Sequence, residues 1–314
     1  MLQLHMGNTC NRLPRHRRVA NPPPMRLMAR DVDALQAVHD YRVLRRDQIQ
    51  KLLFPSCNTA NYRLQRLYQH GFLERRWCPV EYGQGSGRAL YLMGNRGLQL
   101  LTQRLGNMPQ ATSYRIVRKT VRSPFLEHTL AVNDVRIAFS IAAQRERYGI
   151  QKWVREDDLK AAREYVYAST TTGTRRNVAI IPDAYFVLNL GDRRAHFLLE
   201  VDCATETSHR WAQRVRAYLA YVGSGQYARR FGTTSLRILM TTTNLTRLTH
   251  LKRATEQVGG QSLFWFATLE QASPEAILSE RIWQVAGHEG MVGLIADSPG
   301  KERTSPLAVK PLKP

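Results

Sequence analysis

Cysteine and long apolar runs are both scarce in this sequence, and their absence excludes several classes of protein. The 314 residues contain four scattered cysteines, and no two of them have the CxxC spacing. A disulfide framework and a cysteine zinc site are therefore not expected. No apolar run approaches the roughly 18 residues that a membrane-spanning helix needs, and residues 1–30 lack the apolar core of a signal peptide. These absences predict a protein of the reducing cytoplasm with no membrane partner.

Two motifs of DNA enzymology are also missing. The sequence has no GxxxxGK[ST] phosphate loop, so ATP hydrolysis is not expected. It lacks the histidine cluster of HUH-type relaxases, and Tyr218 and Tyr221 fit the packing face of an amphipathic helix. Neither ATP hydrolysis nor strand transfer by a tyrosine is therefore the first expectation.

Acidic residues are greatly outnumbered by basic residues in an otherwise globular composition. The chain has 46 Lys and Arg residues against 25 Asp and Glu residues, a net charge of +21. Apolar residues make up 43% of the 314 residues, which excludes a wholly disordered chain and favours two domains, or one large domain with tails. The charge predicts a polyanionic partner, most often nucleic acid, because each neutralised phosphate releases counterions. An Arg-rich genomic background is the alternative explanation.

Three segments have a composition that predicts little regular structure. Residues 1–29 are read as a basic flexible arm, with an unstructured leader as the alternative. Residues 106–122 contain no acid and are read as a basic linker able to touch a phosphate backbone. Residues 297–314 are rich in Pro and Lys, which predicts a disordered tail. Two domains are therefore expected, over residues 30–105 and 123–296.

The first of these domains has the order of elements that is typical of a winged helix-turn-helix. The pattern predicts helices over 31–41, 46–54 and 58–70, strands over 72–80 and 89–93, and a helix over 96–105. Asp31 is placed to cap the first helix, and Gly71 ends the third. Tyr62 and Leu64 are assigned to the packing side of the third helix. In this fold the third helix enters the major groove of duplex DNA.

Nine polar residues of this domain are the candidate DNA-binding residues. They are Asn58, Thr59, Asn61, Arg63, Gln65 and Arg66 on the third helix and Arg75, Arg76 and Arg88 on the hairpin. Asn and Gln side chains suit adenine, and Arg suits guanine or a phosphate. Double-stranded DNA is the predicted partner, and a winged helix that contacts protein is the alternative.

The second domain alternates helices and strands. The pattern predicts a long helix over 124–148, strands over 177–190 and 195–202, a helix over 208–222, a strand over 236–242, a helix over 245–258 and a strand over 262–269. This order matches the core of the PD-(D/E)xK restriction-endonuclease-like fold, with Pro182-Asp183 and Glu200-Val201-Asp202 as its second and third motifs. The predicted fold class is therefore α/β (α+β), with an N-terminal winged helix-turn-helix and a C-terminal restriction-endonuclease-like α/β domain.

Three carboxylates of the second domain are expected to form one cluster. Glu200 and Asp202 point to the same side of their strand, about 7 Å apart, because side chains alternate along a strand. Asp183 comes close to both if its strand pairs with theirs. Grouped carboxylates repel one another unless a proton or a cation intervenes, and Mg²⁺ prefers oxygen ligands. Asp183, Glu200 and Asp202 are therefore the candidate metal ligands, and Mg²⁺ is the candidate cofactor.

Taken in order, these motifs resemble the replication-relaxation family, whose members are associated with plasmids and mobile elements. The resemblance rests on the winged helix, Phe125-Leu126-Glu127-His128, Pro182-Asp183-Ala184, Glu200-Val201-Asp202 and the helix that bears Tyr218 and Tyr221. It extends from about Arg30 to Trp283, and only the order of the short motifs makes it specific. It implies a role in plasmid replication, DNA relaxation or mobilisation, without fixing a biochemical activity.

Catalysis is the least certain implication, because one position departs from active nucleases. Glu127 joins Asp183, Glu200 and Asp202 as a candidate catalytic residue. The third motif usually ends in Lys, which positions the attacking water, and here it ends in Asp202. Arg214 or Arg216 of the next helix could supply a basic group, but Arg is a poor base because it stays protonated. A metal ion could itself lower the pKa of the water.

Three functions therefore remain open at this stage. The first is a DNA-binding protein of a plasmid or mobile element with a degenerate nuclease-like domain. The second is an Mg²⁺-dependent DNA endonuclease of PD-(D/E)xK type. The third is a non-enzymatic subunit of a larger nucleoprotein complex with protein partners.

Overall fold

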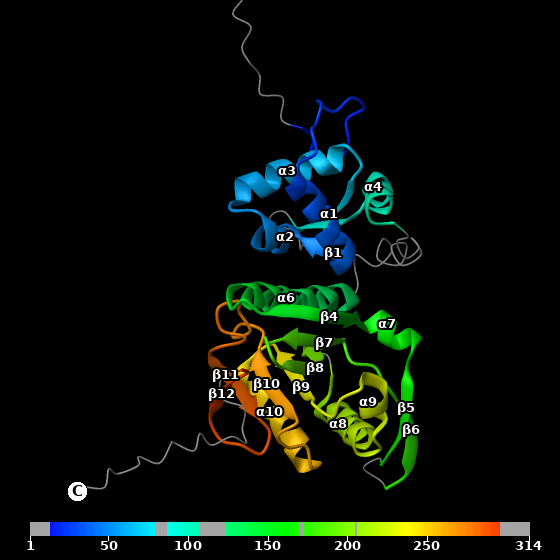
Figure 1. Ribbon diagram of the computed structural model, residues 1–314, viewed down its shortest axis with the longest axis vertical. Helices are drawn as coiled ribbons and strands as arrows, with labels where there is room; N and C mark the ends of the chain where they lie inside the picture. Colours follow the sequence, from blue (N-terminus) through cyan, green and yellow to red (C-terminus); the bar gives the residue numbers. More distant parts are fainter. Residues whose placement is uncertain (1–12, 79–86, 107–123, 170–172, 205, 296–314) are drawn as a thin grey trace, which may run out of the picture. The chain divides into compact units, whose positions relative to one another are not determined.

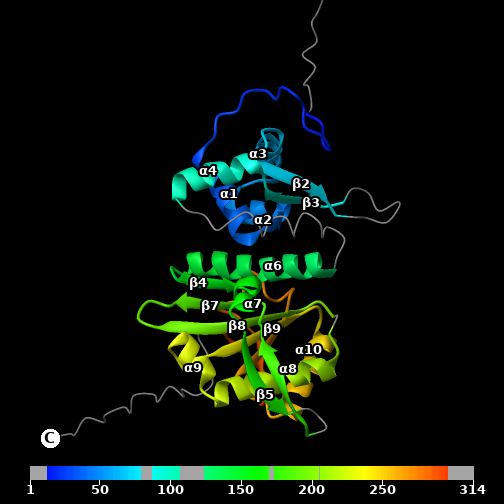
Figure 2. The same ribbon diagram turned by 90° about the vertical axis from the view of Figure 1, so that its right-hand side faces the viewer.

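The computed structural model describes residues 13–78, 87–106, 124–169, 173–204 and 206–295. The chain divides into two compact units, Met1–Asp134 and Val135–Pro314, and the division falls inside helix α6 (Pro124–Arg145) (Figures 1 and 2). The linker predicted over 106–122 lies outside the described residues except for Gly106, and so does the tail predicted over 297–314.

The first unit combines short helices with a small antiparallel sheet. Its described elements in chain order, before α6, are α1 (Ala29–Tyr41), β1 (Val43–Arg45), α2 (Arg46–Leu53), α3 (Cys57–Gln69), β2 (Leu73–Trp77), β3 (Ala89–Met93) and α4 (Asn95–Leu105). The strands pair in the order β1-β3-β2. Three helices, a hairpin and a last helix follow one another as the sequence predicts for a winged helix.

Local sequence explains where α1 and α3 begin and where α3 ends. Ser56 precedes α3, and its hydroxyl accepts the Thr59 N–H at 3.2 Å. Gly71 follows α3 with a φ of +75°, a left-handed conformation that favours glycine. Asp31 lies inside the first turn of α1, and its carboxylate accepts the Met28 N–H at 2.8 Å. Asp31 therefore caps the helix from within rather than from the residue before it.

The helices of the first unit bury one apolar stripe each. Leu35 and Val38 of α1 and Leu64 and Leu67 of α3 are fully buried, and Leu73 of β2 joins them. The three- or four-residue spacing places each pair on one side of its helix. The opposite side of α3 is left outside this core, which makes it the candidate binding side.

The second unit contains one large mixed sheet and a separate hairpin. After α6, its described elements are β4 (Gly149–Arg155), α7 (Glu156–Ala161), β5 (Glu164–Ser169), β6 (Arg175–Ile180), β7 (Ala184–Asn189), β8 (Arg194–Asp202), α8 (Ser208–Gly223), α9 (Gln226–Phe231), β9 (Arg237–Thr242), α10 (Leu245–Gln257), β10 (Phe264–Thr268), β11 (Arg281–Val285) and β12 (Met291–Gly293). Seven strands pair in the order β12-β11-β10-β9-β8-β7-β4, and β8, β9 and β10 run parallel. β5 and β6 form a two-stranded sheet of their own.

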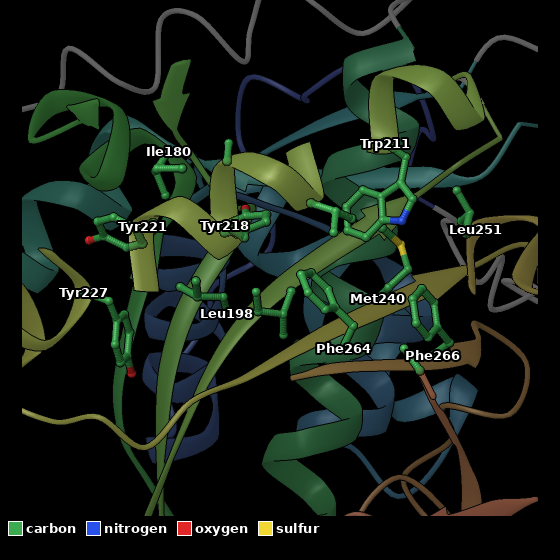
Figure 3. Close-up of a cluster of buried hydrophobic side chains, with 14 of the residues drawn as sticks. Ile180, Leu198, Trp211, Tyr218, Tyr221, Tyr227, Met240, Leu251, Phe264 and Phe266 are labelled. Carbon is green, nitrogen blue, oxygen red and sulfur yellow. The ribbon is translucent and has the colours of Figure 1, made fainter. Parts of the chain in front are cut away.

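Helices cover both faces of the seven-stranded sheet (Figure 1). On one face, the ring of Phe139 in α6 lies 4.8 Å from that of Phe186 in β7, measured between centroids. On the other face, α8 and α10 enclose a core that includes Trp211 and Phe264 (Figure 3). The Trp211 ring N–H donates to Thr255 Oγ1 at 2.8 Å and so joins α8 to α10. Glu200 and Asp202 of β8 lie on this second face.

The predicted α/β fold class is confirmed, with one correction to the strands. β7 pairs antiparallel with β8, and β8 pairs parallel with β9, so the order of long helix, strands, helix and strand is present. The single strand predicted over 177–190 is in fact two strands, β6 and β7. The chain turns between them at Pro182-Asp183, because proline has no N–H to give to a strand ladder.

Candidate functional site

A cationic groove lies beside α3 in the first unit. It has a volume of about 900 Å³ and lies between α2, α3, the β2–β3 hairpin and the N-terminal segment. The arginines that line it are Arg15, Arg46, Arg75 and Arg88. Asp47, which also lines it, forms an ion pair with Arg45 at 3.3 Å. The groove therefore carries an excess of positive charge, which favours an anionic ligand.

Aromatic rings hold two of these arginines in place. The Arg75 guanidinium lies 4.3 Å from the centroid of the Tyr68 ring and 5.4 Å from that of Trp77. The Arg15 guanidinium lies 4.1 Å from the Trp77 centroid, and the Arg15 carbonyl accepts a hydrogen bond from Arg75. A ring or a carbonyl orients a guanidinium without cancelling its charge. Arg75 thus adds positive charge to the groove.

The segment over residues 13–28 packs along α3 and β2, although the sequence predicts a flexible arm. Gln69 of α3 is 3% exposed, and its amide donates to the Pro14 and Arg17 carbonyls at 3.1 and 3.0 Å. A buried amide without partners is costly, so this segment completes the interior of the unit. The prediction of a flexible arm is therefore wrong for these residues, and residues 1–12 lie outside the described part of the chain.

This docked segment divides the solvent side of α3 into a covered half and an open half. In the covered half, Gln65 donates to the Leu13 carbonyl at 2.8 Å, and Arg66 donates to the Pro24 carbonyl. The exposed residues of the open half are Asn58, Thr59, Asn61 and Tyr62. Of the predicted DNA-binding residues on α3, the three polar ones in the open half face solvent directly. On the hairpin, Arg76 and Arg88 are exposed.

Arg63 has a structural partner in place of the predicted base contact. Its guanidinium pairs with the carboxylate of Asp31 on α1, which is 1% exposed, and the Nε–Oδ1 distance is 2.9 Å. The hydrogen bond that Arg63 donates to Asp31 raises the pKa of Arg63 above its ordinary value. A buried carboxylate without a cation is strongly destabilising, so this pair joins α1 to α3.

Tyr62 is a surface residue of α3 that sequence reasoning assigned to the core. It is 57% exposed, and it shares one side of the helix with Asn58 and Gln65. Its position four residues after Asn58 and three before Gln65 is the signal that places it outside. Tyr62 is therefore an additional candidate for ligand contact.

Glu200 of the second unit is buried against α8. Its side chain is 1% exposed and accepts hydrogen bonds from Arg214 and Tyr218 through Oε1. Burial raises the pKa of Glu200 to about 8, an effect that Arg214 opposes and the nearby charge of Asp183 increases. The expected approach of Asp183 to Glu200 is therefore present. Of the two arginines considered for this position, Arg214 reaches the carboxylate.

The carboxylates of Asp183 and Asp202 accept hydrogen bonds from different groups of the protein. Asp183 accepts the Val201 N–H at 2.7 Å. Asp202 accepts Arg247 Nε and Thr242 Oγ1, each at 2.7 Å. Burial acts to raise the pKa of Asp202, but the hydrogen bonds from Arg247 and Thr242 outweigh it and hold that pKa below its ordinary value.

The three carboxylates do not fit an Mg²⁺ site. In the part of the chain that the structure describes, no three His, Cys, Asp or Glu side chains are grouped so that they could hold a metal ion. Arg214 occupies an oxygen of Glu200, and Arg247 bonds to both oxygens of Asp202. A guanidinium at that position repels a divalent cation. The predicted single cluster is corrected accordingly: arginines of α8 and α10 bond to two of its three members.

Glu127, the fourth candidate carboxylate, belongs to the first unit, whereas the other three belong to the second. It is exposed on α6. Burial raises the pKa of the Cys78 thiol, and the charge of Glu127 adds to this rise. A catalytic role for Glu127 stays a prediction.

The family model for replication-relaxation proteins matches residues 35–236, which is more than half of the chain. The chain belongs to the replication-relaxation family. A comparison of this family member with curated proteins found no match.

Two solved structures to which this replication-relaxation protein is similar are the restriction endonuclease FokI bound to DNA and FokI alone. Each is 11% identical with a TM-score of 0.26, and each comparison covers 77% of this chain but 43% or 42% of FokI. The chain thus spans less than half of that protein, and so low a TM-score supports no conclusion about fold or function.

The two tyrosines of the family resemblance are buried in this replication-relaxation protein (Figure 3). The Tyr218 hydroxyl donates to Glu200, and the Tyr221 hydroxyl donates to Glu164. Burial raises the pKa of both phenols well above the ordinary value. A buried phenol with a raised pKa is hard to deprotonate, so it is poorly prepared to attack a phosphate. Among the described helices of this family member, none has the length and hydrophobicity to cross a membrane.

Proposed function

We propose that this replication-relaxation protein binds double-stranded DNA of a plasmid or mobile element and acts there in replication, relaxation or mobilisation. The observation that carries the proposal is the cationic groove beside α3, whose walls bear four arginines. Phosphates suit such a surface because neutralising them releases counterions. Two of the arginines are oriented by aromatic rings.

Recognition of the DNA base sequence is assigned to the open half of α3. The amides of Asn58 and Asn61 are suited to adenine edges, and the exposed ring of Tyr62 offers an apolar contact to a thymine methyl group. Residues in the first turns of the recognition helix are the ones that reach bases in helix-turn-helix proteins. Arg76 and Arg88 of the hairpin are assigned to phosphates, which position the protein without reading sequence.

Fluorescence anisotropy with a labelled duplex tests the groove. We expect the double variant Arg46→Ala/Arg88→Ala to weaken binding about tenfold and to reduce the slope of log K against log salt by about 2, since each lost phosphate contact removes roughly 0.9. Arg104→Ala, an exposed arginine on α4 that does not line the groove, is the matched control. Equal affinity and slope in the groove variant and the control would remove the proposal.

The second unit is proposed to be a nuclease-like domain that does not cleave DNA. Its support is the arginine beside each of Glu200 and Asp202, whose positive charge opposes the binding of a divalent ion there. The alternative, an Mg²⁺-dependent endonuclease, is tested by incubating supercoiled plasmid with Mg²⁺ or Mn²⁺. We expect no nicking. Nicking by the wild type that both Asp183→Ala and Glu200→Ala abolish would establish the endonuclease instead.

A further inference from the structure

The β5–β6 hairpin of the second unit has one packed face and one open face. It stands apart from the seven-stranded sheet and lies beside α8 (Figures 1 and 2). Val166 and Ala168 of β5 point into the core beneath α8 and are 4% and 5% exposed. Because side chains alternate along a strand, Tyr165 and Tyr167 point the opposite way. They are 46% and 72% exposed.

These two exposed rings are unusual for the unit that contains them. Tyr218, Tyr221 and Tyr227 of the same unit are at most 2% exposed, and their hydroxyls donate to protein oxygens. Tyr165 and Tyr167 instead present ring faces about 7 Å apart on the surface of a strand. The fold does not need these two rings for its core, since the inward residues of β5 already fill the contact with α8.

The same open face is basic. Arg175 lies opposite Ser169 in the hairpin register, and Asn177 lies opposite Tyr167. Arg175 is exposed, whereas Arg176 lies opposite Ala168 and so belongs to the other face. The acidic residue of β5, Glu164, also faces the other way and accepts hydrogen bonds from Tyr221 and from Arg230, the latter at 3.1 Å. The exposed rings thus share one face with the positive charge of Arg175.

The hairpin is anchored along its first strand. Gln226 of α9 donates to the Tyr165 carbonyl at 3.3 Å, and Arg230 donates to the Ala162 carbonyl at 2.8 Å. Val166 lies opposite Val178 within the core contact. An anchored strand loses little conformational entropy on binding, so its rings form a prepared surface.

We propose that the open face of β5–β6 binds single-stranded DNA, with bases stacked on Tyr165 and Tyr167 and a phosphate near Arg175. Aromatic rings combined with basic side chains form the usual platform for single strands, whose unpaired bases expose their faces. In duplex DNA these faces are hidden by stacking, so the rings would have no partner there. Because this face is positively charged, it favours a polyanionic nucleic acid over a protein surface that has few acidic residues. This site is additional to the groove proposed for duplex DNA and belongs to the other unit.

Anisotropy with the full chain and a labelled oligo(dT) strand of about 20 nucleotides tests this site, because stacking tolerates any base. Tyr165→Ala/Tyr167→Ala should weaken binding to the strand at least about tenfold and leave the duplex affinity unchanged. Tyr165→Phe/Tyr167→Phe keeps the rings and should bind like the wild type. Because both side chains are exposed, unchanged thermal unfolding of the variants serves as the folding control.

A second pair of variants tests the phosphate contacts. Arg175→Ala should reduce the salt slope for the single strand by about 0.7, the value of roughly one lost contact. Arg253→Ala, an exposed arginine on α10, should not change it.

Three results would overturn the inference. The first is equal oligo(dT) affinity in the Tyr→Ala variant and the wild type. The second is an equal loss of duplex and single-strand binding in that variant. The third is a dimer in sedimentation that the Tyr→Ala variant abolishes while strand affinity stays the same, which would assign the face to self-association. The Arg46→Ala/Arg88→Ala variant reports on the duplex groove separately, so each proposal can fail alone.

Discussion

Arginine has opposite roles in the two units of this protein. In the groove of the first unit, Arg75 lies against aromatic rings and donates to a backbone carbonyl, so its charge adds to the surface potential. In the second unit, Arg214 and Arg247 bond to the buried carboxylates Glu200 and Asp202. A net charge of +21 therefore does not describe one uniform basic surface. Only the partner of each arginine decides whether its charge reaches a ligand or stabilises the interior.

The largest expected effect comes from breaking an internal pair of the second unit. Arg247→Ala should lower the free energy of unfolding by about 3 kcal/mol, because it leaves the 5%-exposed Asp202 without its cation. Urea denaturation measures the change. The control Arg253→Ala, on the exposed side of the same helix, should stay within about 0.5 kcal/mol of the wild type. Equal stability of the two variants would show that Arg247 is not an internal partner.

A somewhat smaller effect is expected from the arginine of α3 that faces inward. Arg63→Ala should destabilise the protein by about 2 kcal/mol, because buried Asp31 loses its charged hydrogen bond. The duplex affinity of the folded variant should stay close to that of the wild type. Urea denaturation and anisotropy measure the two quantities. A stable variant with strongly reduced affinity for DNA would return Arg63 to the predicted set of DNA-contacting residues.

The buried carboxylate of the second unit gives the protein a specific pH dependence. The folded-state pKa of Glu200 is about 8, above its ordinary value of 4.5, so the folded protein holds this proton more tightly than the unfolded chain. The free energy of unfolding should therefore fall as pH rises from about 4.5 to about 8. Glu200→Gln should reduce that fall by about 1–2 kcal/mol. Urea denaturation at pH 5 and pH 8 measures it, and an unchanged fall in the variant would contradict the assignment.

The smallest expected effect concerns the docked N-terminal segment. Gln69→Ala removes the amide that bonds to Pro14 and Arg17 and should cost about 1 kcal/mol of stability. Limited trypsin digestion should then cleave after Arg17 faster than in the wild type, because the segment detaches more often. Gln103→Ala, on the exposed side of α4, is the matched control. If cleavage rates are the same in all three proteins, the segment does not depend on Gln69.

Sequence patterns were sufficient for the parts of the structure that depend on local spacing. The three- and four-residue periodicity predicts α3, and Gly71 marks its end within a residue of the observed boundary. The alternation along β8 places Glu200 and Asp202 on one face, and the pairing of β7 with β8 brings Asp183 near Glu200. These features follow from geometry that repeats along the chain.

The same patterns failed where a distant segment covers or neutralises a residue. Residues 13–28 have an arm-like composition, yet they pack on α3 because Gln69, about 50 residues later, needs hydrogen-bond partners. Tyr62 is apolar enough to be assigned to the core, and the fold leaves it outside. The acidic trio was expected to bind one metal ion, but its members are not grouped in that way, and arginines bond to two of them.

By itself, the sequence determined the excess of basic charge, the order of the main helices of both units and of the strands that position Glu200 and Asp202, and the shared face of those two carboxylates. The tertiary structure alone decided which arginines keep their charge for a ligand, which half of α3 is open, and that Tyr165 and Tyr167 are exposed together. The physical reason is the separation along the chain over which each effect acts. Periodicity acts over a few residues. The ion pair of Asp202 with Arg247 joins two residues that are 45 positions apart, and the hydrogen bond of Gln65 with the Leu13 carbonyl joins two that are 52 positions apart.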